Sequence, residues 1–171
     1  METWDVVRAR RNVRAFSDRP IARGDLERIV EAGWRAPSAK NRQYRDFVVS
    51  TDRAQLQELA DVWQWGRHIA GSAATIVVVI PATSDARGRE LDQFDAGQAD
   101  MAMMLVAADL GIGSGHASVG DQALARRILG VPEDQDCAYM LALGYPADRP
   151  LAPVRKLNRR PVEEVVHWGK W

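Results

Sequence analysis

The sequence predicts an α+β sandwich, in which helices pack against a small β-sheet. Short apolar runs rich in β-branched residues, at 47–49 and 75–81, are typical of buried strands. Stretches with apolar side chains three and four residues apart, such as 24–35, are typical of amphipathic helices. Because helices and strands do not alternate strictly along the chain, a doubly wound parallel sheet is not favoured.

The first half of the chain opens with helical patterns. Thr3 is placed to cap the first helix, and Asp52 is placed to cap the third. The second helix ends before Pro37, because the residue before a proline disfavours the helical region. The expected elements are, in order, a helix over 3–11, a loop over 12–20, a helix over 24–35, a strand over 47–49 and a helix after Asp52 that carries Leu56, Leu59, Ala60 and Trp63.

The second half contains the most apolar helix. The expected elements are a strand over 75–81, a polar loop over 87–92, a helix over 94–110, a glycine-rich loop over 111–120, a helix over 122–129, a strand over 138–143 and a tail over 146–171. Apolar residues surround most of helix 94–110, which indicates burial on several sides, including against another subunit. The tail is rich in proline and charge and cannot form its own core, so it is disordered or lies on another surface.

Composition narrows the class of protein. A length of 171 residues fits a single domain over 1–171, and one cysteine, Cys137, excludes an internal disulfide framework. There is no apolar run of membrane-spanning length and no visible secretory signal, so we expect a cytoplasmic protein with no membrane partner. A net charge of zero argues against a general nucleic-acid binder.

Basic charge is concentrated near the start of the chain. Residues 1–45 hold eleven Lys and Arg against six Asp and Glu, whereas residues 46–125 hold four against eleven. Most of these cations are arginines, whose planar guanidinium matches pairs of phosphate oxygens. A genome rich in G and C would give the same bias, so this observation alone does not decide the function.

Two short segments carry candidate ligand-binding groups. In the segment Arg10-Arg11-Asn12-Val13-Arg14, the arginines would converge on one anion if the helix continued. The alternative is that these cations only complement the dipole at a helix C-terminus. The segment 36–43 offers Ser, Asn and Gln side chains that suit the edge of a heterocycle such as a flavin pyrimidine, and its alternative is an ordinary surface turn.

The glycine-rich segment 111–120 is not a dinucleotide fingerprint, because it follows a helix and has His116 where the last glycine would stand. It also lacks the Lys-Ser or Lys-Thr of a phosphate-binding loop. We interpret it as a loop whose backbone can approach a planar ligand closely. His68, His116 and His167 are isolated, so we predict structural roles for them, no metal site and no catalytic side chain.

Five segments, in the same order and over almost the whole chain, resemble the FMN-dependent nitroreductase family. They are Arg10–Phe16, Ala36–Gln43, Leu110–Ser114, Leu143–Pro146 and Arg159–Trp168. This resemblance implies a mixed, mainly antiparallel sheet flanked by helices. It also implies an intertwined homodimer with FMN at the subunit interface and a C-terminal arm, residues 146–171, exchanged onto the partner.

The resemblance also implies a reaction. FMN would be bound tightly but non-covalently, and NADH or NADPH would serve as co-substrate. Electrons would pass to a small-molecule acceptor, a nitroaromatic, quinone or related compound, by a ping-pong mechanism. The cofactor carries the chemistry in such enzymes, and the protein supplies binding, orientation and charge.

Residue roles follow from the matched segments. Arg10, Arg11 and Asn12 would hold the phosphate and ribityl region, and Arg14 would lie near the ribityl chain and pyrimidine edge. Pro37, Ser38, Asn41 and Gln43 would bind from the middle loop. Backbone groups of Ala117, Ser118 and Val119 would lie near N5 and O4 of the ring, and Arg159 or Arg160 would meet the phosphate.

Other functions remain open for such a chain. The same fold could serve a flavin-fragmenting enzyme, a biosynthetic dehydrogenase or a flavin-binding module without turnover. An arginine-rich RNA-binding domain is disfavoured, because no pair of predicted strands interleaves aromatic and basic residues.

Overall fold

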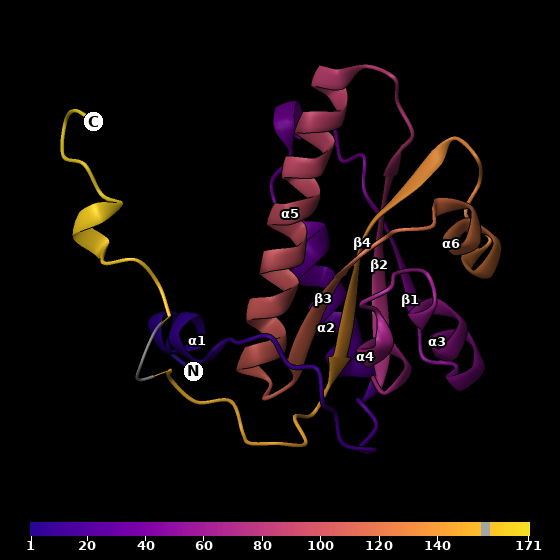
Figure 1. Cartoon of the computed structure of the whole chain (residues 1–171), viewed down its shortest axis with the longest axis horizontal. Helices are drawn as coiled ribbons and strands as arrows, with labels where there is room; N and C mark the ends of the chain where they lie inside the picture. Colours follow the sequence, from indigo (N-terminus) through magenta and orange to yellow (C-terminus); the bar gives the residue numbers. More distant parts are fainter. Residues whose placement is uncertain (155–157) are drawn as a thin grey trace.

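The computed structural model of the protein describes residues 1–154 and 158–171, and its centre is a four-stranded antiparallel sheet (Figure 1). The strands are β1 (Asp46–Ser50), β2 (Ala74–Pro81), β3 (Gly113–Ser118) and β4 (Gln135–Gly144), in the order β1-β2-β4-β3. The central pair runs from Ala74 opposite Leu143 to Pro81 opposite Gln135, with an irregularity between Val78 and Val79. The predicted α+β class and the antiparallel sheet are confirmed.

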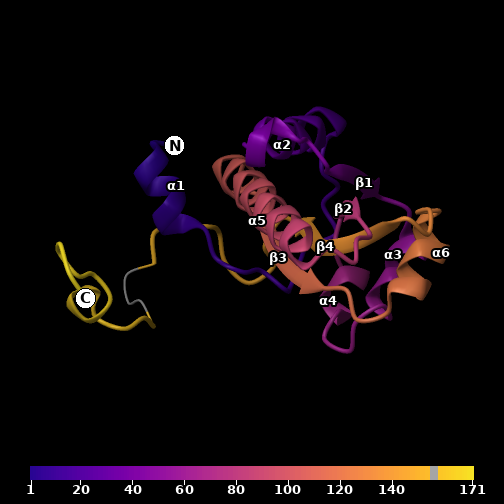
Figure 2. The same ribbon diagram turned by 90° about the horizontal axis from the view of Figure 1, so that it is seen from above.

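The helices cover the two faces of the sheet (Figure 2). One face carries α2 (Arg23–Arg35) and α5 (Ala86–Asp109), and the other carries α3 (Arg53–Ala60), α4 (Arg67–Ala70) and α6 (Gln122–Leu129). The side chains of β2 alternate between the two resulting cores: Ile76 and Val78 pack on the α2–α5 side, and Val77 and Val79 on the other. This burial on both faces explains why β2 reads as a continuous apolar run.

The longest helix, α5, begins earlier than predicted. The carboxylate of Asp85 accepts hydrogen bonds from the backbone N–H groups of Arg87 and Gly88 and so caps the helix. The prediction of a polar loop over 87–92 is therefore wrong. One polar residue of this stretch, Asp92, is buried and paired with Arg42, a contact with another part of the chain that local composition does not reveal.

The glycine-rich segment is a strand, not the loop that was predicted. Residues 113–118 form β3, which pairs with β4 along its length. The chain near the N-terminus crosses the outer edge of β3, where Asn12 forms a β-bridge with Ser114. A Cβ on Gly113 would lie 2.6 Å from Cγ2 of Val13, so the absence of a side chain lets this crossing occur. The glycines here accommodate the protein's own backbone.

Several boundaries differ in detail. Helix α1 (Thr3–Ala9) is shorter than predicted, and no side chain caps it, so the expected cap at Thr3 is wrong. The cap at Asp52 is confirmed, because its carboxylate accepts a 2.8 Å hydrogen bond from the N–H of Gln55. Helix α4 and the short 3₁₀ helices η1 (Ala39–Asn41) and η2 (Val162–Glu164) were not predicted.

The C-terminal arm leaves the body of the molecule after β4 (Figures 1 and 2). The N–H of Val154 donates to the carbonyl of Arg8, and residues 158–171 are all exposed. Val162, Val165, Trp168 and Trp171 are among its exposed apolar side chains. As predicted, the tail has no core of its own. Within the described ranges, no helix combines the length and apolarity needed to cross a membrane.

Candidate functional site

The segment Arg10–Arg14, called the head below, is extended rather than helical. Helix α1 ends at Ala9, Arg10 adopts an extended backbone, and the N–H of Val13 donates to the carbonyl of Ser114 at 2.8 Å. The arginines therefore do not converge through helical spacing, which corrects that prediction. Pairing with β3 fixes the head in place of helical hydrogen bonds.

Two side chains of the head already have partners in the same chain. Nη1 of Arg10 lies 3.4 Å from Oδ1 of Asn12. Nη2 of Arg11 donates to Oδ1 of Asp148 at 2.7 Å and to the carbonyl of Arg149 at 2.9 Å. The hydrogen bond from Arg11 holds the pKa of the Asp148 carboxyl below its usual value. Arg11 thus ties the head to the beginning of the arm.

Arg14 is exposed and lies close enough to His68 for its charge to act on that ring. The pKa of His68 is lowered, chiefly because burial disfavours the charged imidazole, and the nearby Arg14 adds to the shift. His68 Nε2 lies 3.3 Å from the carbonyl oxygen of Gly115. Arg14 is therefore a cation of the head whose charge reaches His68, beside Gly115 of β3, and it has no ion pair among the described residues.

The middle loop has an unusual backbone. Lys40, Asn41 and Gln43 have φ angles of 53°, 54° and 58°, in the left-handed region that side chains other than glycine seldom adopt. The hydroxyl oxygen of Ser38 accepts a hydrogen bond from the N–H of Gln43, which closes the loop. Strained, closed loops of this kind concentrate at ligand-binding sites.

The segment Ala117–Val119, whose backbone is predicted to contact the flavin ring, lies at an edge of the sheet. Ala117 and Ser118 pair with Met140 and Tyr139 of β4, and in the described part of the chain no strand lies on their other side. Ala117 is buried, Ser118 is exposed and Val119 is half-buried. An edge strand presents free N–H and C=O groups, so this segment can offer backbone hydrogen bonds to a ligand.

A buried carboxylate pairs with His116. Oδ2 of Asp100, on α5, lies 2.8 Å from Nε2 of His116, whose ring stacks on Tyr139 at 5.0 Å between centroids. The Asp100 side chain is 5% exposed, and its Oδ1 has no hydrogen-bond partner among the described residues. The sequence spacing around His116, which has no carboxylate four residues away, did not indicate this partner. An aspartate inside an apolar helix was the signal for a buried partner.

Cys137 gives a simple prediction. Burial raises the pKa of its thiol from 9.0 to about 11, so the native thiol stays protonated at neutral pH. We expect no reaction of the folded protein with a thiol reagent at pH 8, and one reactive thiol after unfolding. Between about pH 9 and 11 the folded state keeps a proton that the unfolded state loses, so stability should fall as pH rises. Native labelling at the unfolded rate would contradict this.

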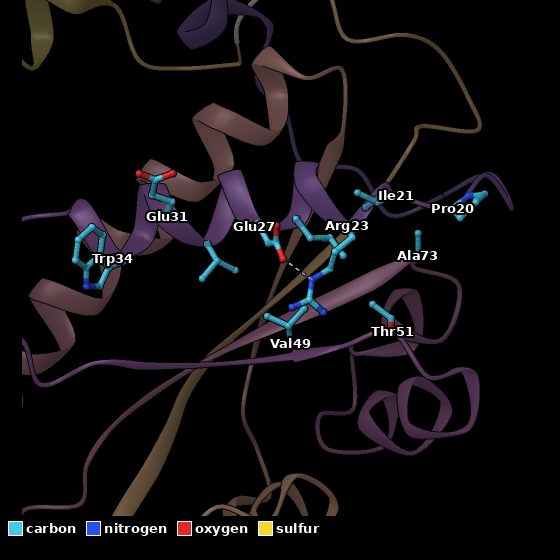
Figure 3. A pocket seen from close by; sticks show the side chains of 11 residues that line it. Pro20, Ile21, Arg23, Glu27, Glu31, Trp34, Val49, Thr51 and Ala73 are labelled. Carbon is cyan, nitrogen blue, oxygen red and sulfur yellow. Dashed lines mark hydrogen bonds and ion pairs between the residues drawn. The ribbon is translucent and has the colours of Figure 1, made fainter.

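Two grooves lie on the α2–α5 side of the molecule. The first, of about 640 Å³, lies along α5 and includes Pro37, Phe94, Gly97 and Met101. The second, of about 660 Å³, lies between α2 and the edge strand β1 (Figure 3). Pro37 lines the first groove, and none of the predicted site residues lines the second.

A single copy does not gather the predicted site residues. The head meets the start of β3, at Ser114, just beyond the C-terminal end of α5, and β3 then runs back along the helix, where His116 contacts Asp100. The middle loop is bonded to Asp92 and Asp95, in the N-terminal half of α5 (Figure 1). From Asp95 to Asp109 the helix advances by 14 residues, which is about 21 Å. In the arm, Arg159 donates to the carbonyl of Asn158 and Arg160 pairs with Glu164. Among the described residues, neither Arg159 nor Arg160 has a hydrogen bond or an ion pair with the head or with the middle loop.

The fold is shared with solved structures of known class. It superimposes on the NADPH:FMN oxidoreductase from Vibrio harveyi complexed with NAD⁺ with a TM-score of 0.85, at 24% identity, over 99% of this chain and 77% of that one. The FMN-dependent nitroreductase from Clostridium difficile gives a TM-score of 0.85 at 21% identity, over 98% of this chain and 99% of that one. These likenesses establish the architecture.

Sequence comparison identifies the family. The protein is 32% identical over 174 residues to an Archaeoglobus fulgidus protein provisionally named NADH dehydrogenase/NAD(P)H nitroreductase, with 99% of each chain covered. The profile of the nitroreductase family matches residues 7–66 and 62–145. The protein belongs to the nitroreductase family, as the sequence motifs predicted. It is an enzyme of the oxidoreductase class.

Proposed function

We propose that this enzyme transfers electrons from NADH or NADPH to a small organic acceptor, a nitroaromatic, quinone or related compound, with FMN held between two copies of the chain. The observation that carries the proposal is the separation of the head, which lies beyond the C-terminal end of α5, from the middle loop, which is bonded to Asp92 and Asp95 in the N-terminal half of that helix. The head offers guanidinium groups that suit a phosphate, and the middle loop offers Ser, Asn and Gln side chains that suit the edge of a ring, so we assign different parts of FMN to the two segments.

An exposed apolar stripe on α5 supports a homodimer. Phe94 is 67% exposed and Met101 45% exposed, and Gly97 and Leu105 continue the stripe at helical spacing. Such a surface on the longest helix is typical of a protein–protein interface. If a two-fold axis crosses this stripe, the helices run antiparallel, and the middle loop of one copy meets the head of the other.

The arm would complete this assembly. Strand β1 is an edge of the sheet, and the groove beside it is lined by apolar groups such as Trp34 and Val49 (Figure 3). The arm carries exposed Val162, Val165 and Trp168 that need a surface to cover them. We assign the groove to the arm of the partner, because an extended segment beside an edge strand gains backbone hydrogen bonds and apolar contacts together. Residues 155–157 of the arm lie outside the described residues.

The residues present fit FMN. Arg10 and Arg14 provide guanidinium groups for a phosphate and for the polar edge of a ring, and Ser38, Asn41 and Gln43 provide both donors and acceptors. Pro37 of the middle loop lines the groove along α5, so the loop borders the surface on which the partner would pack. Arg11 is predicted as a further phosphate contact, while its guanidinium also holds Asp148.

These residues would bind and orient rather than transfer protons. FMN, when bound, supplies the capacity to accept a hydride from a nicotinamide and to pass electrons to an acceptor. Arg14 would stabilise negative charge that develops on the pyrimidine side of the ring. The backbone groups of Ser118 and Val119 would orient the opposite edge, and the partner's α5 would exclude water. One open face would serve both substrates in turn, which gives ping-pong kinetics.

Replacing Arg14 with alanine should weaken FMN retention or slow flavin reduction, because it removes an exposed cation of the head that is available to a ligand. We expect the purified variant to hold less flavin than the parent protein, or to reduce more slowly under anaerobic NAD(P)H. Arg87, an exposed cation paired with Glu90 on α5, is the matched control, and its alanine variant should behave as the parent does. An Arg14 variant that stays yellow and reduces at the parent rate would end this assignment.

The proposal is tested by the visible absorption spectrum of the purified protein, before and after anaerobic addition of NADH or NADPH. We expect a flavin spectrum that bleaches with the nicotinamide and returns when a quinone is added. A colourless protein that does not take up FMN would contradict the proposal, and a flavin that never bleaches would indicate a binding module. Destruction of reduced FMN in air would indicate a flavin-fragmenting enzyme. The cytoplasmic location remains a prediction from sequence.

A further inference from the structure

We infer that two buried aspartates of α5, Asp92 and Asp95, act with Arg42 and Arg45 as a clamp that fixes the middle loop in its ligand-binding conformation. These four residues, called the α5 clamp, are positioning residues, which hold the loop and act on the ligand only through it. The inference rests on the proposed function, because it assigns the loop to FMN.

The loop needs an external restraint. Lys40 and Gln43, like Asn41, have left-handed backbone angles, and neither lysine nor glutamine prefers this region. Residues in such conformations persist only where the surrounding structure determines them. The hydrogen bonds inside the loop, from Gln43 N–H to Ser38 Oγ and from Gln43 Nε2 to the Asn41 carbonyl at 3.3 Å, join loop residues only to one another.

The two aspartates supply the restraint from α5. Oδ2 of Asp95 accepts a 2.9 Å hydrogen bond from the N–H of Ala39, and Oδ1 of Asp92 accepts a 2.7 Å hydrogen bond from Nη2 of Arg42. Both aspartates are 4% exposed. Buried carboxylates are costly unless they are paired, so these contacts are more than the incidental pairs of a surface turn.

Arg45 holds the start of the loop. Its guanidinium donates to the carbonyls of Ala36 and Pro37, at 2.7 and 2.8 Å, and lies 3.3 Å from the carbonyl of Asp95. One planar group thus joins the beginning of the loop to the backbone of α5. The loop is held at its start by Arg45, in its middle by Asp95 and near its end by Asp92.

The clamp and the ligand groups occupy different sides of the loop. Arg42 and Arg45 are half-buried, while Lys40, Asn41 and Gln43 are exposed. The clamp therefore leaves the predicted binding groups free for a ligand and sets the backbone from which they extend. Such preorganisation raises affinity by removing the cost of ordering the loop on binding.

The test is a double-mutant cycle on Asp92 and Arg42, in the full-length protein, with FMN affinity as the first readout. Asp92→Asn and Arg42→Gln should each raise the Kd for FMN about tenfold, and the double variant should be no weaker than either single one. At saturating FMN, kcat should return to about the parent value, within about twofold, because the chemistry is untouched. Glu90→Gln, which breaks the exposed Arg87–Glu90 pair on the same helix, is the control and should leave Kd unchanged.

The outcomes separate the clamp from the proposed function. Folded variants with the parent Kd, or single effects that simply add in the double variant, would overturn the clamp while the proposed function stands. A parent protein that binds no FMN would overturn both. If Asp92→Asn does not fold, Arg42→Lys keeps the charge at the surface end of the pair and loses the planar geometry. Its Kd should still rise, and an unchanged Kd would overturn the clamp.

Discussion

Replacing Gly115 with alanine is expected to lower the free energy of unfolding by more than about 3 kcal/mol. A Cβ at this position would collide with the carbonyl oxygen of Val13 and would lie 2.8 Å from Cδ2 of His68. The carbonyl belongs to the backbone of the head, which is held in place by the bond from Val13 N–H to Ser114. The head cannot move away without losing its pairing with β3.

The variant should therefore lose FMN as well as stability, because Arg10 and Arg14 move with the head. Thermal and denaturant unfolding measure the first effect, and the flavin content of the purified protein measures the second. Gly24→Ala is the matched control, since a Cβ on Gly24 meets nothing within 4 Å and the residue lies in helix α2. It should leave stability unchanged or raise it by up to about 1 kcal/mol. A Gly115→Ala protein as stable as this control would contradict the crossing of the head over β3.

The second large effect is expected at His116. His116→Phe should lower the free energy of unfolding by about 3 kcal/mol, because it leaves the Asp100 carboxylate buried with no partner on either oxygen. Phenylalanine keeps an aromatic ring beside Tyr139, so the lost stacking contributes little. Denaturant unfolding at neutral pH measures the change.

A second substitution shows whether the loss of stability comes from the unpaired Asp100 carboxylate or from altered packing. In Asp100→Leu with His116→Phe, no buried charge remains, so the double variant should regain most of the lost stability. Arg87→Gln on the same helix breaks an exposed pair and should change stability by less than about 0.5 kcal/mol. If the double variant is less stable than His116→Phe alone, the Asp100–His116 pair is not the cause.

Local sequence patterns were enough to predict most of the sheet. The apolar runs at 47–49, 75–81 and 138–143 fall within β1, β2 and β4, because a strand of the central sheet is buried and therefore apolar. Strand β3 was missed because Gly-Ser-Gly-His-Ala-Ser has the composition of a turn. Its glycines reflect the crossing of Val13, a contact between residues about a hundred positions apart.

The candidate site was predicted in part for a similar reason. Family motifs pointed to the head, the middle loop and β3, and the family itself is confirmed. The α5 clamp and the Asp100–His116 pair have no local pattern, because each joins residues that are distant in sequence. Asp100, in the apolar half of α5, was a signal of a buried partner, whereas Asp92 lies in a polar stretch and gave no such signal.

The central claim is that each flavin site takes the head of one copy and the middle loop of the other. The most direct test uses two variants that carry different tags. The head variant has both Arg10→Ala and Arg14→Ala, and the loop variant has both Ser38→Ala and Asn41→Ala. The two variants are mixed, and the dimer that contains one copy of each is isolated. Each variant alone should hold little FMN. In the mixed dimer one site combines both defects and the other has none, so we expect about one FMN per dimer, half the parent content. A mixed dimer as poor in FMN as the two variants alone would show that the head and the loop of one chain serve the same site.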